Sequence, residues 1–371
     1  MKPLKAPLPT DAVALQGGLR GRGAASNRGG RYLQATREAD AEQLEQQRLQ
    51  EGVPERVATV VQVVRSRQII SQNQSPDIPF HQSINPYQGC EHGCIYCYAR
   101  PSHAWHDLSP GLDFETRLFA KPDAADLLRK ELAKPGYQAS PIMLGANTDP
   151  YQPIDRQWQI TRQLLQVLLD CRHPVGIITK SALIERDLDL LQALAAQGLI
   201  QTYLSVTTLD AELARRLEPR AATPLRRLQA VQALHRAGVS VGVLVAPIIP
   251  ALTDAGVFSV LQAAAEAGAG SASYVILRLP LEIRDLFVEW LKQHYPQRAE
   301  HVMSVLQQMR GGQDYQSAYG ERMKGRGPYA DMLRRQFALH CRRLGLARRS
   351  LDVRCDLFQP PSPANGQLSL F

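Results

Sequence analysis

The stretch NPYQGCEHGCIYCYARP, residues 85–101, carries three closely spaced cysteines, Cys90, Cys94 and Cys97, and the next cysteine is Cys171. In a reducing compartment, clustered thiols indicate a metal site or a catalytic site rather than a disulfide framework. The spacing C-x3-C-x2-C allows the three sulfurs of a compact loop to converge on one polynuclear centre. The remaining cysteines are scattered, which is typical of small buried apolar side chains.

Two kinds of metal centre are compatible with this loop. A zinc site needs a fourth ligand, for which the neighbouring histidines are His92, His103 and His106, although none stands at a usual zinc-finger interval. A ferredoxin-type cluster takes four thiolates. Three thiolates on a 4Fe-4S cluster leave one iron without a protein ligand, and that open iron would be the reactive position.

Composition limits the class of protein. The 371 residues are 44% hydrophobic and carry a formal net charge of +8. The most apolar run, VSVGVLVAPIIP at 239–250, is too short to cross a bilayer, and the first residues lack the apolar core of a signal peptide. We therefore expect a cytoplasmic protein without a membrane span, whose positive charge suits a polyanionic partner.

Short β-branched runs alternate with longer amphipathic runs from about residue 80 onward. The strand-like runs are PIMLGAN (141–147), PVGIITK (174–180), TYLSVTT (202–208), VSVGVLVAPII (239–249) and ASYVILRLP (272–280). With a first strand before the cysteines, the alternation predicts about six βα units and a parallel sheet. Because no glycine-rich dinucleotide turn follows these strands, we predict an α/β fold with a partial (βα)6 TIM-type barrel, whose chemistry lies at the carboxyl ends of the strands.

The chain divides into four predicted regions. Residues 1–57 are of low complexity and are expected to be disordered, residues 58–285 form the barrel core, residues 286–356 form a helical basic extension, and residues 357–371 form a Pro-rich linker and tail. Arginines lie between glycines in the first region, where they could follow a phosphate backbone or simply be solvated. Arginines and aromatic residues are interleaved in the extension, which suits either stacking on nucleic acid or packing on the barrel.

The cysteine loop, with Tyr96 as the aromatic residue before the last cysteine and βα repeats after it, resembles the radical S-adenosylmethionine (radical SAM) superfamily. The resemblance implies a 4Fe-4S cluster on Cys90, Cys94 and Cys97. It implies that the fourth iron binds S-adenosylmethionine, whose reductive cleavage releases a 5′-deoxyadenosyl radical, and that an electron donor such as flavodoxin or ferredoxin is a partner.

The resemblance also implies roles for residues at the predicted strand ends. Asn147 and Asp149 of GANTDPYQPID stand where the superfamily places a polar motif for the cofactor amino group. The predicted cofactor-binding residues are Tyr96, Asn147, Asp149, Lys180 (for the carboxylate), Ser205 and Thr207 (for ribose hydroxyls) and Arg220 (for a carboxylate); the predicted catalytic residues are Cys90, Cys94, Cys97 and Tyr98. A surface position is the alternative for Lys180, and an ion pair with Glu218 or another neighbour is the alternative for Arg220.

Within the superfamily, SPDIPFHQSINPYQGCEHGCIYCYARPSH and EPRAATPLRRLQAVQALHRAGVSVGVLVAPIIP are similar to the bacterial group related to spore photoproduct lyase, the DNA-repair photolyase-like group. This resemblance covers roughly residues 60 to 345 and implies repair of a nucleobase lesion in DNA. In spore photoproduct lyase a cysteine near the second strand returns a hydrogen atom, whereas PIMLGANTDP contains none. The candidates to replace it are Tyr96, Tyr98, Cys171 and Cys341.

The tail QLSLF, residues Gln367 to Phe371, resembles the motif by which bacterial DNA polymerases and repair proteins dock on the replication sliding clamp. A flexible tail can insert Leu368, Leu370 and Phe371 into an apolar cleft at the cost of its ordering entropy. We therefore expect DNA and the clamp as partners; the alternative is a tail folded back on the barrel.

Two other functions remain open from the sequence. In one, the radical chemistry has another target, such as tRNA, a peptide or a small molecule. In the other, the protein is a non-catalytic, metal-containing adaptor that binds DNA.

Overall fold

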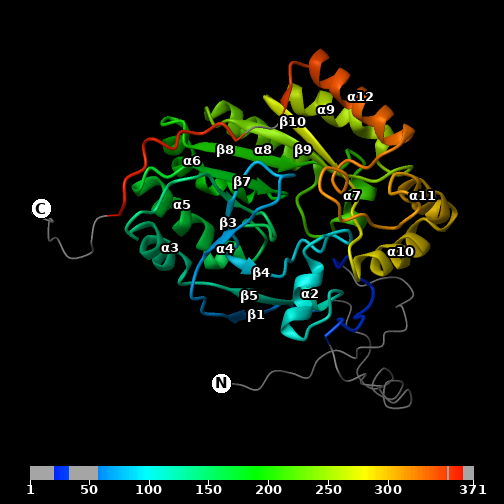
Figure 1. The fold of residues 1–371 in the computed structure, drawn as a ribbon, viewed down its shortest axis with the longest axis horizontal. Helices are drawn as coiled ribbons and strands as arrows, with labels where there is room; N and C mark the ends of the chain where they lie inside the picture. The colour runs from blue at the N-terminus through cyan, green and yellow to red at the C-terminus, as the bar shows by residue number, and fades with distance from the viewer. Residues whose placement is uncertain (1–20, 33–56, 349–350, 362–371) are drawn as a thin grey trace, which may run out of the picture.

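The computed structural model describes residues 21–32, 57–348 and 351–361 (Figure 1). Its centre is a sheet in the order β11-β10-β9-β8-β7-β6-β3-β2. The strands are β2 Ile70–Gln72, β3 Gln82–Ile84, β6 Ile142–Leu144, β7 Val175–Thr179, β8 Ile200–Ser205, β9 Val241–Ile248, β10 Ser271–Ile276 and β11 Ala347–Arg348. Neighbours from β3 to β11 pair in parallel, and β2 pairs antiparallel with β3. The predicted partial barrel of βα units is confirmed.

The helices lie outside the sheet (Figure 1). They are η1 Arg100–His106, α2 Asp113–Thr116, α3 Ala124–Leu132, α4 Asp155–Trp158, α5 Ile160–Asp170, η2 Ala182–Asp187, α6 Leu188–Ala195, α7 Ala211–Leu217, α8 Pro224–Arg236, η3 Asp254–Gly256, α9 Val257–Glu266, α10 Ile283–His294, α11 Pro296–Gln308 and α12 Pro328–Arg343. Local signals set several bounds: the Thr223 hydroxyl caps α8 by accepting from the Arg226 amide, and Gly238 follows that helix with φ +73°.

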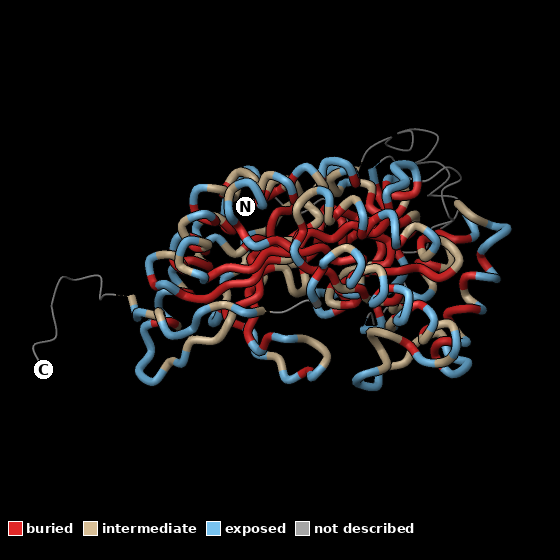
Figure 2. The backbone as a smooth tube through the Cα atoms, turned by 90° about the horizontal axis from the view of Figure 1, so that it is seen from above, coloured by how far each residue is buried: buried red, intermediate tan, exposed pale blue. Residues whose placement is uncertain are grey.

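Burial is concentrated in the central layer of strands, with exposed segments outside it (Figure 2). All six residues of β8 are buried, as expected for a strand covered on both faces. The parallel register pairs Ile84 with Leu144 and Leu144 with Ile177. The segments that follow β3, β6 and β7 therefore emerge at the same edge of the sheet.

A second, small sheet in the order β1-β5-β4 was not predicted from the sequence. Its strands are β1 Val60–Val63, β5 Arg117–Ala120 and β4 Tyr87–Gln88. They are short, and β4 and β5 are separated by the cysteine loop, so no periodic pattern marks them. The sheet fixes β4 immediately before that loop.

Residues 21–32 lie within the region expected to be disordered, but they pack against the cysteine loop and helix α10. Arg22 is buried, and its guanidinium donates to the carbonyl oxygens of Glu115 and Val57 at 2.8 and 2.6 Å. The Ser26 hydroxyl donates to Glu289 of α10 at 3.0 Å. The expectation of disorder is therefore wrong for these residues, because buried polar partners far along the chain compensate for their lack of apolar side chains. The other residues of 1–57, except Val57, lie outside the described ranges.

The end of the chain also contacts the barrel. The Arg354 amide donates to the Gly198 carbonyl, and the Gln359 amide donates to the Cys171 carbonyl, both at 2.9 Å. Phe358 packs edge-on against His173, with ring centroids 5.3 Å apart. Since Gly198 and His173 immediately precede β8 and β7, residues 351–361 cross the edge opposite the strands' carboxyl ends. The predicted clamp-binding tail, residues 367–371, lies outside the described ranges.

No helix among the described residues combines the length and apolar character that a membrane crossing requires.

Candidate functional site

A cavity of about 490 Å³ opens at the carboxyl ends of the barrel strands. It is lined by all three cysteines of the loop and by residues in or just beyond the carboxyl-terminal parts of β6, β7, β8, β9 and β10. The residues used below are Cys90, His92, Cys94, Tyr96, Cys97, Tyr98, Ala146, Asn147, Asp149, Thr179, Lys180, Ser205, Ala246, Pro247, Arg278, Tyr319, Arg322 and Met323. The fold thus brings together side chains that are far apart in the chain, such as Cys90 and Met323.

The cysteine loop is a series of tight turns. The Gly93 amide donates to the Cys90 carbonyl at 3.3 Å, and the Cys97 amide donates to the Cys94 carbonyl at 3.2 Å. Gly93 has φ +66°, and a Cβ atom there would lie 2.7 Å from Glu115 Oε2. The loop therefore needs glycine at this position both for its backbone angle and for its close contact with Glu115.

The loop rests on a buried ion pair. The Arg100 guanidinium donates to the carbonyl oxygens of Cys94, at 2.9 Å, and Gly93, at 3.2 Å. It also pairs with Glu115 at 2.5 Å, and neither side chain is exposed to solvent. Glu115 in turn accepts from the amides of Gly23 and Ala24 at 3.0 and 2.9 Å. One carboxylate thereby joins the loop to the amino-terminal segment 21–32.

Asp149 organises the edge of the cavity beyond β6. Its carboxylate accepts from the Thr179 hydroxyl and the Lys180 amide, both at 2.7 Å, and contacts His92 Nδ1 at 3.3 Å. Burial alone would raise the pKa of Asp149, but the adjacent His92 and these hydrogen bonds outweigh it and lower the pKa to about 2. The ionised carboxylate thus holds the ends of β6 and β7 and the cysteine loop together.

The family assignment follows from the same part of the chain. A sequence model of the radical SAM superfamily matches residues 84–264, which include the cysteine loop and the strand ends through β9. The chain thus contains a radical SAM domain over these residues. Among curated relatives, an uncharacterized protein of Mycobacterium tuberculosis is 36% identical over 222 residues, which cover 59% of this chain and 65% of that protein. An uncharacterized protein of Methanocaldococcus jannaschii is 28% identical over 219 residues, which cover 59% of this chain and 78% of that one. The match to the mycobacterial protein thus spans less than two thirds of its length.

Solved structures share the fold of this chain. Spore photoproduct lyase complexed with dinucleoside spore photoproduct aligns with a TM-score of 0.57 and 16% identity, over 78% of this chain and 81% of the lyase. A mutant of the lyase with bound AdoMet and dinucleoside spore photoproduct aligns with a TM-score of 0.54 and 17% identity, over the same shares of the two chains. At this level of identity, the similarity supports the barrel fold.

The cysteines fit the iron-sulfur cluster that the superfamily implies. All three are free thiols and line one cavity. Burial raises the pKa of each thiol, so binding as thiolates requires a cationic partner, which iron supplies. Among the described residues, no three His, Cys, Asp or Glu side chains are arranged around a single metal ion. In a cubane cluster each cysteine binds a different iron, so such an arrangement is not needed.

Tyr96, predicted to bind the cofactor, belongs to a buried network beside the cavity. Its hydroxyl donates to Glu218 and lies 3.3 Å from the Thr207 hydroxyl. Glu218 also forms a buried ion pair with Arg227. Burial would raise the pKa of Glu218, but Arg227 and further neighbours lower it to about 2. Glu218 and Arg227 were not predicted as site residues, because their contacts depend on helix α8 packing against β8.

The other predicted residues divide into two groups. Asn147, Lys180 and Ser205 line the cavity, and Lys180 Nζ lies 5.8 Å from the centre of the Tyr96 ring. Thr207 and Arg220 do not line it. Thr207 donates to Glu218 at 2.8 Å, and Arg220 pairs with Glu91 at 3.1 Å. The ion-pair alternative for Arg220 therefore describes its position, although its partner is Glu91 and not Glu218.

Tyr98, the predicted catalytic tyrosine, lines the cavity directly after the last cysteine. Its hydroxyl donates to the Ala146 carbonyl, which follows β6. The other candidates for hydrogen-atom return, Cys171 and Cys341, do not line the cavity. Ala146 and Asn147 also line the cavity, so Tyr98 lies beside the segment that follows β6.

The cavity wall beyond β10, which is formed by Arg278, Tyr319, Arg322 and Met323, was not predicted from the sequence. Arg278 lies in a run predicted as a strand, so a lone charged residue near the end of an apolar run was the available signal. Arg322 donates to Asp77 and Ser75 of the loop between β2 and β3. These contacts join segments about 245 residues apart, which no local pattern reveals.

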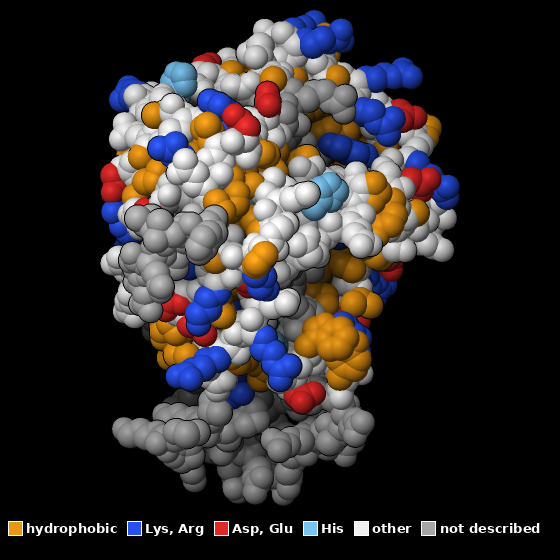
Figure 3. All heavy atoms as spheres, turned by 60° about the vertical axis from the view of Figure 1, so that its left-hand side comes forward, with side chains coloured by type: hydrophobic (Ala, Val, Ile, Leu, Met, Phe, Trp, Pro, Cys, Tyr) orange, Lys and Arg blue, Asp and Glu red, His pale blue; other side chains and the backbone are white. Residues whose placement is uncertain are grey.

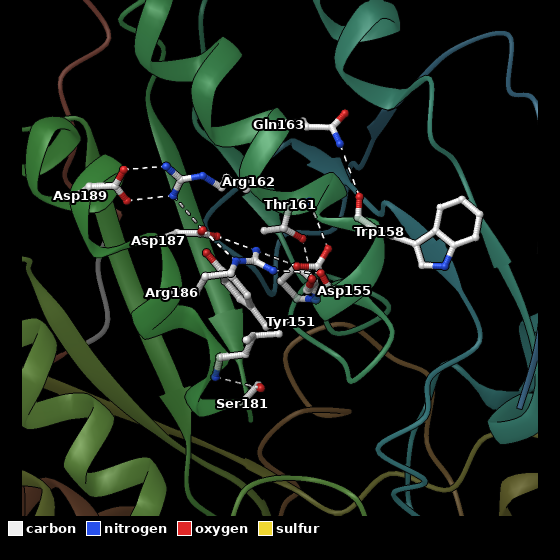
Figure 4. A network of polar contacts seen from close by, with 12 residues as sticks. Tyr151, Asp155, Trp158, Thr161, Arg162, Gln163, Ser181, Arg186, Asp187 and Asp189 are labelled. Carbon is white, nitrogen blue, oxygen red and sulfur yellow. Dashed lines mark hydrogen bonds and ion pairs between the residues drawn. The ribbon is translucent and has the colours of Figure 1, made fainter.

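A polar network outside the cavity supports the same strands (Figure 4). Arg186 pairs with Asp155 and Asp187, each at 2.8 Å, and Arg162 pairs with Asp189 at 2.6 Å. The Tyr87 hydroxyl donates to Asp155 at 2.5 Å. Through these contacts β4, which precedes the cysteine loop, is tied to the helices that follow β6 and β7. Within this region α4 and α5 are separated at Gln159, which adopts φ 49°.

Proposed function

We propose that this protein is a radical SAM enzyme that holds a 4Fe-4S cluster on Cys90, Cys94 and Cys97 and acts on a nucleobase lesion in DNA. The single observation that carries the proposal is that all three thiols of one loop line one cavity with the polar ends of β6, β7 and β8. When bound, the cluster and S-adenosylmethionine supply reductive cleavage to a 5′-deoxyadenosyl radical, and the protein supplies orientation and exclusion of water.

The side chains around the cavity offer groups for an amino acid and a nucleoside. Lys180 provides a cation for a carboxylate, and the carboxylate of Asp149 fixes the Lys180 backbone through its amide at 2.7 Å. Asn147 and Ser205 add hydrogen-bonding groups on neighbouring strand ends. Ala246 and Pro247, at the end of β9, add apolar surface for an aromatic ring. We assign the cofactor to this side of the cavity.

Tyr98 is the catalytic side chain in this proposal. It stands between the cysteine loop and β6, and its hydroxyl is fixed by the Ala146 carbonyl. Homolysis of its O–H bond would return a hydrogen atom to a substrate radical and leave a tyrosyl radical, which one electron from a protein donor and one proton from solvent would convert back to tyrosine. The same protein donor, such as flavodoxin or ferredoxin, would serve the cluster.

Charge and the end of the chain support DNA as the partner. The net charge of +8 suits a polyanionic partner, although on the face in Figure 3 the Lys and Arg side chains are spread among apolar ones and form no single patch. The structurally similar lyase is complexed with a dinucleoside photoproduct. The tail Gln367–Phe371 is proposed to bind the sliding clamp, so deletion of residues 367–371 should abolish clamp binding in a pull-down with purified clamp.

The experiment that tests the function is anaerobic reconstitution of the full chain, followed by measurement of iron, sulfide and reductive S-adenosylmethionine cleavage. We expect a cubane spectrum and 5′-deoxyadenosine, with product formation raised by ultraviolet-irradiated DNA but not by undamaged DNA. Cys94→Ala should lose cluster and cleavage, whereas Cys355→Ala, at an exposed cysteine away from the loop, should keep both.

Each part of the proposal can fail separately. About one zinc per chain without a cubane spectrum, or an active Cys94→Ala protein, would contradict the radical SAM assignment. Cleavage that is stimulated by tRNA or a peptide and not by irradiated DNA would retain the chemistry and reject the substrate. A DNA-binding protein without cofactor cleavage would be the adaptor.

A further inference from the structure

Arg278 lies two residues beyond β10, the last strand of the parallel barrel core before the carboxyl-terminal extension, and lines the cavity. Its guanidinium carbon is 5.3 Å from the ring centre of Tyr98, which follows the last cysteine of the loop. The two side chains come from opposite ends of the βα series, after β3 and after β10. Arg278 therefore places a cation beside the cysteine loop, between the first and the last βα units of the partial barrel.

The protein leaves most of the hydrogen-bonding capacity of Arg278 unused. Its Nη1 donates to Met323 Sδ at 3.1 Å, and a thioether is a weak acceptor. Its Nε is buried and has no hydrogen-bond acceptor among the described residues. Arg278 also forms no ion pair with a carboxylate in those ranges. Since a buried donor without a partner costs free energy, the site is suited to a ligand that supplies acceptors.

A second arginine increases the positive charge of this wall. Arg310 is buried, and its guanidinium donates only to the carbonyl oxygens of Glu321 and Leu277, at 2.9 and 3.0 Å, among the described residues. Burial and the nearby charge of Arg278 lower the pKa of Arg310 to about 10. Neutral carbonyl oxygens do not cancel its charge. Arg310 does not line the cavity, but its positive charge lies near that of Arg278.

Arg322, a third arginine of this wall, differs from Arg278 because it has an acidic partner within the protein. Arg322 donates to the Asp77 carboxylate and to the Ser75 hydroxyl, so its charge is compensated within the protein. Its contacts fix the loop between β2 and β3 against residues 319–323. The wall thus contains a structural arginine with an acidic partner and an arginine, Arg278, that faces the cavity without one.

We propose that Arg278 binds a phosphate oxygen of the DNA strand next to the nucleotide that enters the cavity. This inference rests on the proposed DNA substrate, and it assigns a residue that binds the phosphate backbone of that DNA. The planar guanidinium matches a phosphate through paired N–H donors, and the adjacent Tyr98 ring, 47% exposed, provides a surface on which a base or sugar can stack. An oxyanion at Arg278 lies beside the cysteine loop, so the bound phosphate positions the reacting nucleotide.

The carboxylate of S-adenosylmethionine is also an oxyanion, so it is the alternative to a DNA phosphate as the anion that Arg278 binds. Lys180 already provides a cation for that carboxylate at the end of β7. Arg278 lies three strands away from β7 in the sheet order. We therefore assign the phosphate to Arg278 and leave the cofactor carboxylate to a separate arm of the test.

The experiment uses the full chain with its reconstituted cluster under anaerobic conditions. A fluorescein-labelled oligothymidylate, ultraviolet-irradiated or undamaged, is titrated with wild type, Arg278→Met and Arg278→Lys at several NaCl concentrations. Arg298→Met is the matched control, because Arg298 is exposed on α11 and does not line the cavity. We expect Arg278→Met to weaken DNA binding about tenfold and to reduce the slope of log K against log salt by about one. Arg278→Lys should recover part of the affinity, and Arg298→Met should stay close to wild type.

The outcomes separate this inference from the proposed function. If wild type binds neither DNA probe, the DNA substrate is wrong. If wild type binds DNA and Arg278→Met behaves as Arg298→Met does, the phosphate site at Arg278 is wrong. If Arg278→Met loses binding of radiolabelled S-adenosylmethionine but retains DNA binding, the anion is the cofactor carboxylate, which also overturns the inference. Iron content and visible absorption report whether each variant is folded, and Arg278→Lys gives the same comparison if the methionine variant is not.

Discussion

Arg100 and Glu115 form a fully buried ion pair, with 2.5 Å between Nη2 and Oε1, on which the cysteine loop packs. Arg100 also donates to the carbonyl oxygens of Cys94 and Gly93, and Glu115 accepts from the Gly23 and Ala24 amides. The pair therefore sets the backbone position of two of the loop's residues and the path of the amino-terminal segment.

Removal of one partner of this pair should be costly. Arg100→Met leaves the Glu115 carboxylate buried without its cation, so we expect a loss of about 3 to 5 kcal/mol in the free energy of unfolding. The loop should also lose iron. Chemical denaturation and iron analysis measure the two effects. Arg216→Met removes a partly exposed i,i+4 pair with Glu212 and should cost less than about 1 kcal/mol; equal losses in the two variants would contradict the role of the buried pair.

Contact between residues 21–32 and the loop can be tested at Gly23. A Cβ atom added there would lie 1.9 Å from the Gly93 carbonyl oxygen, so Gly23→Ala must displace backbone. We expect a loss of about 1 to 3 kcal/mol in stability and faster loss of the cluster in air. Thermal unfolding and the decay of visible absorption measure these changes.

Gly256→Ala is the control for Gly23→Ala, because a Cβ atom at Gly256 meets no other atom within 4 Å. This variant should be as stable as wild type. If Gly23→Ala is equally stable, the amino-terminal segment does not pack on the loop as described.

Lys180 should contribute to cofactor affinity. It lines the cavity at the end of β7, and its ammonium group faces the Tyr96 ring at 5.8 Å. Lys180→Met removes this cation and should weaken S-adenosylmethionine binding about tenfold. Equilibrium dialysis with radiolabelled cofactor measures the effect. Lys292→Met, at an exposed position on α10, is the comparison; equal affinities would place the cofactor carboxylate elsewhere.

His173 predicts a pH dependence of stability. It is buried, Nδ1 lies 2.9 Å from the Pro174 carbonyl and Nε2 lies 2.9 Å from the Tyr137 hydroxyl. Burial lowers its pKa from 6.5 to about 4. Below pH 6.5 the unfolded chain therefore takes up a proton that the folded protein does not, until the pH reaches about 4.

The contribution of neutral His173 is thus fully present above pH 6.5 and is lost as the pH falls towards about 4. We expect a loss on the order of 3 kcal/mol over this range. Urea denaturation at a series of pH values should show a shallower decline for His173→Gln than for wild type. Parallel profiles for the two proteins would show that His173 titrates alike in the folded and unfolded states.

Much of the barrel could be predicted because its signals are local. Each predicted strand overlaps an observed one, for example 174–180 and β7 Val175–Thr179, and α8 begins at its Thr223 cap and ends before Gly238. Short strands without periodicity were missed, as in the sheet formed by β1, β4 and β5. Residues 21–32 were assigned wrongly because their stabilising partners, such as Glu115, lie about 91 residues away.

The sequence by itself determined the chemistry of the site: three thiols at fixed spacing on one loop, and polar residues at the ends of successive strands. Spacing within a short segment and the alternation of strand and helix are properties of the local chain, so they are visible without coordinates. Only the tertiary structure decided that Arg220 pairs with Glu91 away from the cavity. It also decided that Tyr96 donates to Glu218, which pairs with Arg227, and that Arg278 lies beside the Tyr98 ring. These pairings depend on which charged groups become neighbours when the sheet curves and the helices pack, and no local pattern encodes that choice.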